Sequence, residues 1–129
     1  MTLQKAKIGT FESRPYFLVE EALLNESVIV RSIPKYVTLK KTGEQKMVID
    51  IEIAKKPKEY SEDIEDLKER KESNLRVWFM NKTSSNQAID LLGDNEDKWI
   101  GKTLPIEILT QMIDGKKRKV VYVKGANEE

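Results

Sequence analysis

The sequence contains neither cysteine nor histidine. The first absence excludes disulfide bonds, thiolate metal sites and a cysteine nucleophile, and the second removes the commonest general base and metal-ligating side chain. A nucleophile such as Thr83 or Ser84 would lack the histidine partner that usually activates a hydroxyl group. We therefore expect a protein that is not an enzyme and that binds no metal ion or cofactor.

The sequence also lacks an excess of charge of one sign and any long apolar run. Its 23 basic and 22 acidic residues leave a formal net charge of +1, so affinity for a polyanion would have to come from a local basic patch. No apolar segment approaches the roughly 18 residues of a membrane-spanning helix, and the first residues lack the apolar core of a signal peptide. We expect a cytoplasmic, single-domain protein with no membrane partner.

Five segments have the residue pattern of β-strands. Residues 45–54 are the clearest, because isoleucines and a methionine alternate with lysine and carboxylates, which predicts one core face and one solvent face. Residues 27–40 are rich in β-branched side chains, and Pro34 in their middle predicts a bend because proline cannot donate to a β-ladder. The other strands are predicted over residues 75–80, 99–108 and 120–123.

One helix interrupts this β pattern. Its N-cap is predicted within residues 83–85, with Ser84 and Gln87 at capping-box spacing, and Gly93 would end it. The side chains expected to face the core are Ala88, Leu91 and Leu92. A helix between the third and fourth of five strands is typical of the OB-fold, so we predict a mainly β, OB-fold-like barrel over residues 27–125, with Trp99 in its core.

Three further segments lie outside this barrel or interrupt it. Residues 1–26 form an N-terminal lead segment, in which residues 16–24 fit either a short amphipathic helix or a strand entering the barrel. Residues 55–74 mix both charge signs with few apolar side chains, which predicts an exposed insertion containing a short helix or a loop. Residues 126–129 are expected to fray.

Basic residues gather around the two predicted hairpin turns, one at Gly43 and the other at Asp114-Gly115. OB-fold proteins commonly grip their ligands with the loops at these positions. The candidate phosphate-binding residues at the first turn are Lys35, Lys40, Lys41 and Lys46. Those at the second turn are Lys116, Lys117, Arg118 and Lys119, although a solubilising turn explains that run equally well. Arg76 and Lys82 complete the basic set.

Aromatic platforms are the second requirement for binding single strands, because each stacked base contributes about 1–3 kcal/mol. The candidates are Tyr36, Trp78 and Tyr122, each on a predicted strand. Trp78 shares a face with Arg76 and could point outward, although a core position fits the sequence as well. Asp50 and Glu52 count against this interpretation, because they would place carboxylates on the usual ligand face.

Three short motifs follow one another in the second half of the chain: Asn81-Lys82-Thr83, Leu92-Gly93-Asp94 and Trp99-Ile100-Gly101-Lys102. Through them the chain resembles a family of small, uncharacterised proteins found mainly in bacteriophages and mobile elements. In that family a strand ending near Asn-Lys-Thr-Asn precedes a short helix, an acidic turn and a Trp-x-Gly-Lys strand start. Here Ser84 and Ser85 replace the usual continuation, and residues 55–74 are longer than is typical. The resemblance implies a viral protein with an OB-like barrel and no catalytic residues.

These features favour the binding of single-stranded nucleic acid without marked sequence preference, with DNA as the expected ligand and RNA as the other possibility. The process would be replication, recombination or repair of a virus or mobile element, with other replication proteins as further partners and the host cytoplasm as the compartment. Because a fold alone is weak support for a function, a protein–protein interaction adaptor that binds no nucleic acid stays open as the alternative. Only nucleic-acid binding should weaken steeply with salt.

Overall fold

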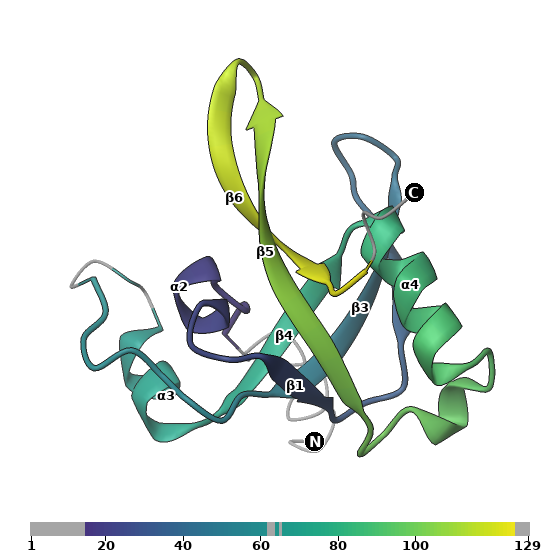
Figure 1. Cartoon of the computed structure of the whole chain (residues 1–129), viewed down its shortest axis with the longest axis horizontal. Coiled ribbons are helices and arrows are strands. Elements are labelled where there is room, and N and C mark those ends of the chain that lie inside the picture. Colours follow the sequence, from purple (N-terminus) through teal and green to yellow (C-terminus); the bar gives the residue numbers. More distant parts are fainter. Residues whose placement is uncertain (1–14, 62–63, 65, 126–129) are drawn as a thin grey trace, which may run out of the picture.

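Figure 1 shows a computed structural model of the chain, which describes residues 15–61, 64 and 66–125. The described residues form one six-stranded sheet with short helices around it, which confirms the predicted mainly β class. The strands are β1 (Ser27–Val30), β2 (Lys35–Thr38), β3 (Gln45–Glu52), β4 (Leu75–Met80), β5 (Thr103–Ile113) and β6 (Lys116–Val123). The helices are α2 (Val19–Ala22), α3 (Leu67–Glu72), α4 (Lys82–Leu92) and the 3-10 helix η1 (Glu96–Lys98).

Strand β3 organises the sheet, in which every pairing between named strands is antiparallel. Along one edge, β3 pairs first with β2 and then with β1; along its other edge it pairs with β4. Met47 of β3, for example, lies opposite Tyr36 of β2 and Met80 of β4. The interruption between β1 and β2 contains Pro34, so the predicted bend is confirmed. Strand β5 pairs with both β1 and β6, whereas no pairing joins β4 to β6 in the described part of the chain. The sheet is therefore open along that line.

The core lies on one face of β3, as its alternating pattern predicts. Met47, Ile49 and Ile51 are at most 2% exposed and pack with the core side chains of β4, β5 and β6. The opposite face was expected to face solvent, and this expectation is wrong. Val48 is fully buried and Asp50 is only 8% exposed. Phe79 and Val77 of β4 lie directly opposite these two residues in the ladder, so the second face of β3 is covered too.

Helix α4 packs against β3, β4 and β6, and it begins earlier than predicted. Its N-cap is Asn81, whose side-chain oxygen accepts a hydrogen bond from the Ser84 backbone nitrogen at 2.8 Å. Ser84 is instead buried, and its hydroxyl oxygen accepts a hydrogen bond from the Val123 backbone nitrogen at 3.0 Å. The serine that was predicted as a cap therefore joins the helix to β6.

The C-terminal end of α4 agrees better with the sequence. Gly93 ends the helix with a φ of 91°, a backbone conformation that residues other than glycine rarely adopt. Trp99 is fully buried as predicted, and its Nε1 donates to the Gly93 carbonyl oxygen at 2.9 Å. Ala88 also lies in the core, whereas Leu91 is exposed and Ile89 packs against the core in its place. None of the helices in the described ranges is long and apolar enough to cross a membrane.

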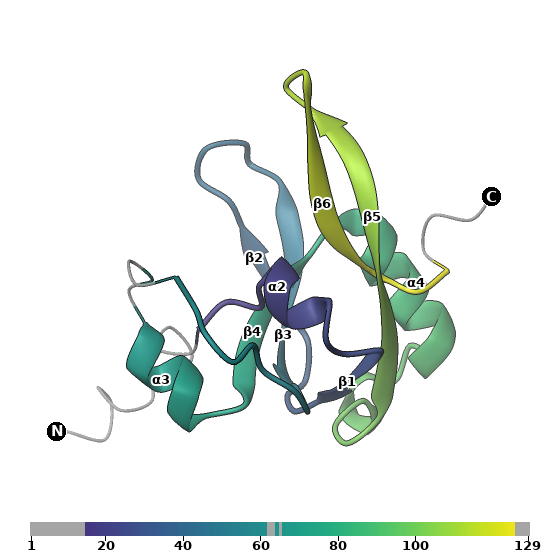
Figure 2. The same ribbon diagram turned by 60° about the vertical axis from the view of Figure 1, so that its left-hand side comes forward.

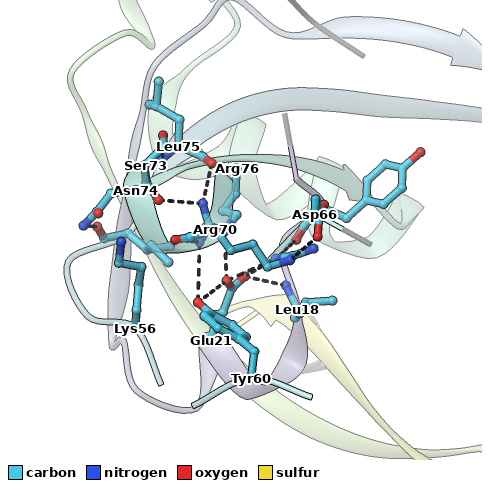
Figure 3. Close-up of polar contacts among 12 residues, drawn as sticks. Leu18, Glu21, Lys56, Tyr60, Asp66, Arg70, Ser73, Asn74, Leu75 and Arg76 are labelled. Atoms are coloured by element: carbon cyan, nitrogen blue, oxygen red, sulfur yellow. Dashed lines mark hydrogen bonds and ion pairs between the residues drawn. The ribbon is translucent and has the colours of Figure 1, made fainter. Parts of the chain in front are cut away.

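Where the structure describes residues 55–74, they are mostly exposed or half-buried, as their composition predicts, and they contain the short helix α3. Arg70 of α3 is nevertheless buried, and it shares the carboxylate of Glu21 of α2 with Arg76 of β4. Glu21 and Arg76 are both fully buried. Tyr60 approaches the same carboxylate (Figure 3). We call Glu21, Tyr60, Arg70 and Arg76 the ionic cluster. Composition does not reveal the burial of Arg70, because that burial depends on a carboxylate from α2. Asp63, one of the residues considered there, lies outside the described residues.

The ionic cluster uses nearly all the hydrogen-bonding capacity of its members. The Glu21 carboxylate accepts from Tyr60 Oη at 2.8 Å, Arg76 Nε at 2.9 Å and Arg70 Nη1 at 3.1 Å. Arg76 also donates to the carbonyl oxygens of Ser73 and Arg70, at 2.9 and 3.0 Å, and to Tyr60 Oη at 3.5 Å. Three separate parts of the chain, namely the lead segment, residues 55–74 and β4, are therefore fixed to one another.

Candidate nucleic-acid interface

Two hairpins carry the predicted basic clusters, and both project toward the same end of the molecule (Figures 1 and 2). The β2–β3 hairpin turns at Gly43, which has a φ of 72°, and it carries Lys40 and Lys41. The longer β5–β6 hairpin turns at Asp114 and Gly115, which both have positive φ as a tight turn requires. Both predicted turns are confirmed. The two lysine-rich loops can therefore reach one ligand.

The four basic residues of the β5–β6 hairpin do not share one face. Lys117 and Lys119 lie opposite Met112 and Thr110, on the face that continues the core side of the sheet. Lys116 and Arg118 alternate onto the other face, because successive side chains of a strand point to opposite sides. Lysines 117 and 119 are therefore the two that can face a ligand on the core side of this hairpin.

A pocket of about 340 Å³ lies where the sheet is open, between β4 and β6. We call it the seam pocket. The lead segment runs along β4 beside it: the Phe17 backbone nitrogen donates to the Val77 carbonyl oxygen at 3.0 Å, and the Val77 nitrogen donates to the Pro15 oxygen at 2.9 Å. Lys46 from β3 and Lys119 from β6 line the same pocket. The two predicted basic clusters thus contribute to a single concavity.

Four aromatic residues line the seam pocket: Tyr16, Phe17, Trp78 and Phe79. Trp78 was a predicted platform but is only 5% exposed, whereas Tyr16 and Phe79, which are more accessible, were not predicted. Tyr16 is 60% exposed, and its ring meets the half-buried ring of Phe79 edge to face, with centroids 5.6 Å apart. Both rings also line a second depression, of about 510 Å³, together with residues 37–40 of the β2–β3 hairpin. The pair therefore connects the concavity beside the first hairpin with the one beside the second. We call this continuous surface the groove.

Carboxylates are less of an obstacle to an anionic ligand than the sequence suggests. Glu52 is paired with Arg31 at 2.7 Å, and Asp50 lies largely beneath the surface. Lys46 has Glu44 at 3.5 Å, a half-exposed contact that contributes little in water. Asn81 also lines the seam pocket beside these lysines, and its side-chain nitrogen can donate a hydrogen bond. The groove thus combines lysines, an amide and two rings.

Three predicted contact residues are buried, and an outward role for them is wrong. Trp78 is 5% exposed and packs edge to face against Phe17, with ring centroids 5.5 Å apart. Arg76 belongs to the ionic cluster, and Tyr122 is buried with its hydroxyl oxygen accepting from the Gln111 amide. In β4 the face away from the core carries Val77 and Phe79, so the core alternative that the sequence left open for Trp78 is the correct one.

Tyr36 and Lys82 are exposed but lie away from the groove. They line another depression, between the β3 end of the first hairpin and the start of α4. The Tyr36 hydroxyl donates to Glu96 Oε2 at 3.0 Å, and burial together with this carboxylate raises the pKa of Tyr36 above 10.0. Lys35 faces the same side of β2 as Val37, which lines the groove. The groove itself is lined by Lys40, Lys46 and Lys119. Lys41 follows Lys40 in the first hairpin, and Lys117 shares a strand face with Lys119.

The sequence contained one signal that could have identified the aromatic pair. Phe79 alternates with Trp78, so a core assignment for Trp78 would have placed Phe79 outward. No signal marked Tyr16, because its position depends on a lead segment that pairs with β4 from a distance in sequence. No protein-family model, curated protein or solved structure matches this chain, so the resemblance to the bacteriophage family stays a prediction.

Proposed function

We propose that this protein binds single-stranded DNA, without marked sequence preference, along the groove between its two basic hairpins. The observation that carries the proposal is the position of the Tyr16–Phe79 pair, which lies at the seam pocket with Lys46 and Lys119 beside it. Lysine side chains suit a backbone whose phosphates recur at regular intervals, and exposed rings suit bases of any identity. This combination explains binding without base-specific hydrogen bonds.

The strand order supports an OB-type interpretation of the fold. If β1 and β2 are taken as one bent strand, the described residues form five strands with α4 between the third and the fourth. The two hairpins then correspond to the loops with which OB-folds grip their ligands. In this interpretation the barrel stays open between β4 and β6, and Pro15–Phe17 occupy part of the opening. The ligand would cross the outer side of β3 and β4, over Phe79.

The lysines and the aromatic rings of the groove would contribute to the binding free energy in different ways. The lysines attract phosphates and release counterions from the strand, which makes the affinity depend strongly on salt. The rings supply a term that salt does not screen, because stacking depends on contact area and dispersion. With a net charge of only +1, the chain gives little attraction at long range, so most of the affinity has to arise within the groove.

The test compares two double variants that remove the same charge from the same hairpin. Lys117→Gln with Lys119→Gln neutralises the core-side pair, and Lys116→Gln with Arg118→Gln neutralises the opposite pair. Fluorescence anisotropy with a labelled oligothymidine is measured over a range of salt concentrations. We expect the salt slope to fall by about 1.4 for the first pair, at about 0.7 for each single-strand phosphate contact, and by clearly less for the second.

Two outcomes would overturn the proposal. If both pairs reduced the affinity and the slope equally, the charges would act only through the general field of the hairpin, and the groove would not be the site. If the unmodified protein bound no oligothymidine even at low salt, a protein-interaction adaptor would become the better explanation. Oligouridine of the same length, measured in parallel, tests the expected preference for DNA.

A further inference from the structure

A second surface, separate from the groove, exposes leucines beside lysines. Leu23 and Leu24, at the end of α2, are 56% and 42% exposed, and they line a depression of about 570 Å³ with Pro57. Three lysines from the loop after β3 also line it: Lys55, Lys56 and Lys58. We call this the leucine–lysine surface. Adjacent exposed leucines are unfavourable in water, and a contiguous apolar patch with a polar rim is typical of an interaction site.

The leucine–lysine surface is held in a fixed shape by Asn25, which is 8% exposed. Its side-chain oxygen accepts from the backbone nitrogens of Ala54 and Lys55, both at 3.0 Å. Its side-chain nitrogen donates to the carbonyl oxygens of Glu21 and Lys55 at 2.8 and 2.9 Å. One amide thus satisfies four backbone groups and joins α2 to the lysine-rich loop, so a ligand would meet a preorganised surface.

The charges at this surface are unequal. Lys55 and Lys58 are exposed, and Lys56 directs its ammonium group to the Lys71 carbonyl oxygen at 2.7 Å. Among the described residues that line the depression, Glu20 is the only carboxylate. We propose that the leucine–lysine surface docks an acidic segment of a partner protein that carries apolar side chains. Its apolar residues would cover the leucines, and its carboxylates would meet the lysines at the rim.

This docking site does not depend on the groove. The loop that carries the three lysines follows the C-terminal end of β3, whereas the β2–β3 hairpin joins the opposite end of that strand. A partner could therefore occupy the leucine–lysine surface while a nucleic acid lies between the hairpins. Apolar contact in the centre would supply most of the affinity, and the lysines would select an acidic segment over a basic one.

The test uses the full chain and a short labelled peptide in which aspartates alternate with leucines. Two control peptides carry asparagine in place of aspartate, or serine in place of leucine. We expect the first peptide to bind and Leu23→Ser with Leu24→Ser to weaken it about tenfold or more, as for the loss of an interface anchor. The matched variant Leu91→Ser, at an exposed leucine on α4, should leave binding unchanged. Lys55→Gln with Lys58→Gln should weaken the aspartate peptide but not the asparagine peptide.

Circular dichroism shows whether each variant keeps its fold, which is expected because the substituted side chains are exposed. Equal affinity of the aspartate and asparagine peptides would overturn the proposal, since the lysines would then play no part. Insensitivity to the double leucine substitution in a folded variant would also overturn it. A third outcome would overturn the proposal as well. If vesicles containing phosphatidylglycerol bound through Leu23 and Leu24 and the peptide did not bind, the surface would recognise lipid. Loss of oligothymidine binding by groove variants has no bearing on this result.

Discussion

Two charged segments of this chain place basic side chains in opposite environments. Residues 55–74 supply Arg70 to a buried cluster, where it shares the Glu21 carboxylate with Arg76. Residues 116–119 are fully basic and exposed along the projecting β5–β6 hairpin (Figure 2). The difference is that the first segment has a carboxylate within reach, and the second has none among the described residues that pair with it. A charge can be buried only when a partner satisfies it.

The comparison separates a structural use of charge from a binding use. In the ionic cluster two arginines meet Glu21, and a third ion pair, at 2.7 Å, joins Arg70 to Asp66. The charges are therefore balanced and surrounded by protein. On the hairpin the charges add without compensation and remain hydrated, so they are available to an anion from outside. Each region should respond to substitution in a different measurement.

The largest effect is expected from Glu21→Gln. This change removes the carboxylate that pairs with buried Arg76 and leaves Arg70 with Asp66 alone. Removing one partner of a buried ion pair destabilises a protein by about 3–5 kcal/mol. Urea denaturation followed by tryptophan fluorescence measures the free energy of unfolding. The matched change Glu20→Gln, at the exposed neighbour, should alter it by less than about 0.5 kcal/mol. Equal effects of the two substitutions would show that the cluster does not stabilise the fold.

The next largest effect, on oligothymidine affinity, is expected at Tyr16, which contacts both the ionic cluster and the groove. Its carbonyl oxygen accepts a hydrogen bond from Arg70 Nη1 at 2.8 Å, while its ring lies in the groove. Tyr16→Ala keeps the backbone contact and removes the ring, so we expect oligothymidine binding to weaken by about 1–3 kcal/mol. Tyr36→Ala removes a tyrosine of similar exposure outside the groove and should leave binding nearly unchanged. A larger effect of Tyr36→Ala would move the site to the other side of β2.

The elements that the sequence predicts correctly are those determined by local chemistry. The alternation around Ile49 places the core face of β3, Pro34 interrupts the first strand, and glycines at 43 and 115 form the turns. These features depend on side-chain period, a missing donor and positive φ, which a single sequence displays directly. The positions of both basic hairpins follow from them.

The errors concern contacts between residues distant in sequence. Arg76 looks like a surface cation until Glu21, 55 positions away, is placed beside it. Trp78 and Phe79 are both bulky, so the pattern of β4 alone does not decide which of them faces the core. The lead segment settles this, because Phe17 packs against Trp78 and Tyr16 against Phe79. Pairing of this kind leaves no periodic trace in the sequence.

A smaller effect on the free energy of unfolding is expected at Tyr60, the half-buried member of the ionic cluster. Burial, and then the hydrogen bond to Glu21, raise the pKa of Tyr60, while Arg76 acts in the opposite direction. A raised pKa in the folded state means that the neutral phenol contributes stability below pH 10.0, its ordinary pKa, and that this contribution is lost as the pH rises through the folded value. We expect Tyr60→Phe to lower the free energy of unfolding by about 1 kcal/mol at pH 7, for the lost hydrogen bond. The difference should shrink in urea titrations above pH 10, and a difference that grew there would contradict the assigned sign.

The smallest effect on stability is expected from the hairpin itself. Lys117→Gln with Lys119→Gln removes two exposed charges that make no ion pair among the described residues, so the free energy of unfolding should change by less than about 0.5 kcal/mol. The same variant should lose affinity for oligothymidine. Glu21→Gln offers the reverse case, in which stability falls and any remaining folded protein keeps its hairpin lysines. If the hairpin variant were instead strongly destabilised, Lys117 and Lys119 would have structural partners. The lysines of the groove would then stabilise the fold, as the ionic cluster does, and the distinction between structural and binding charges would not hold.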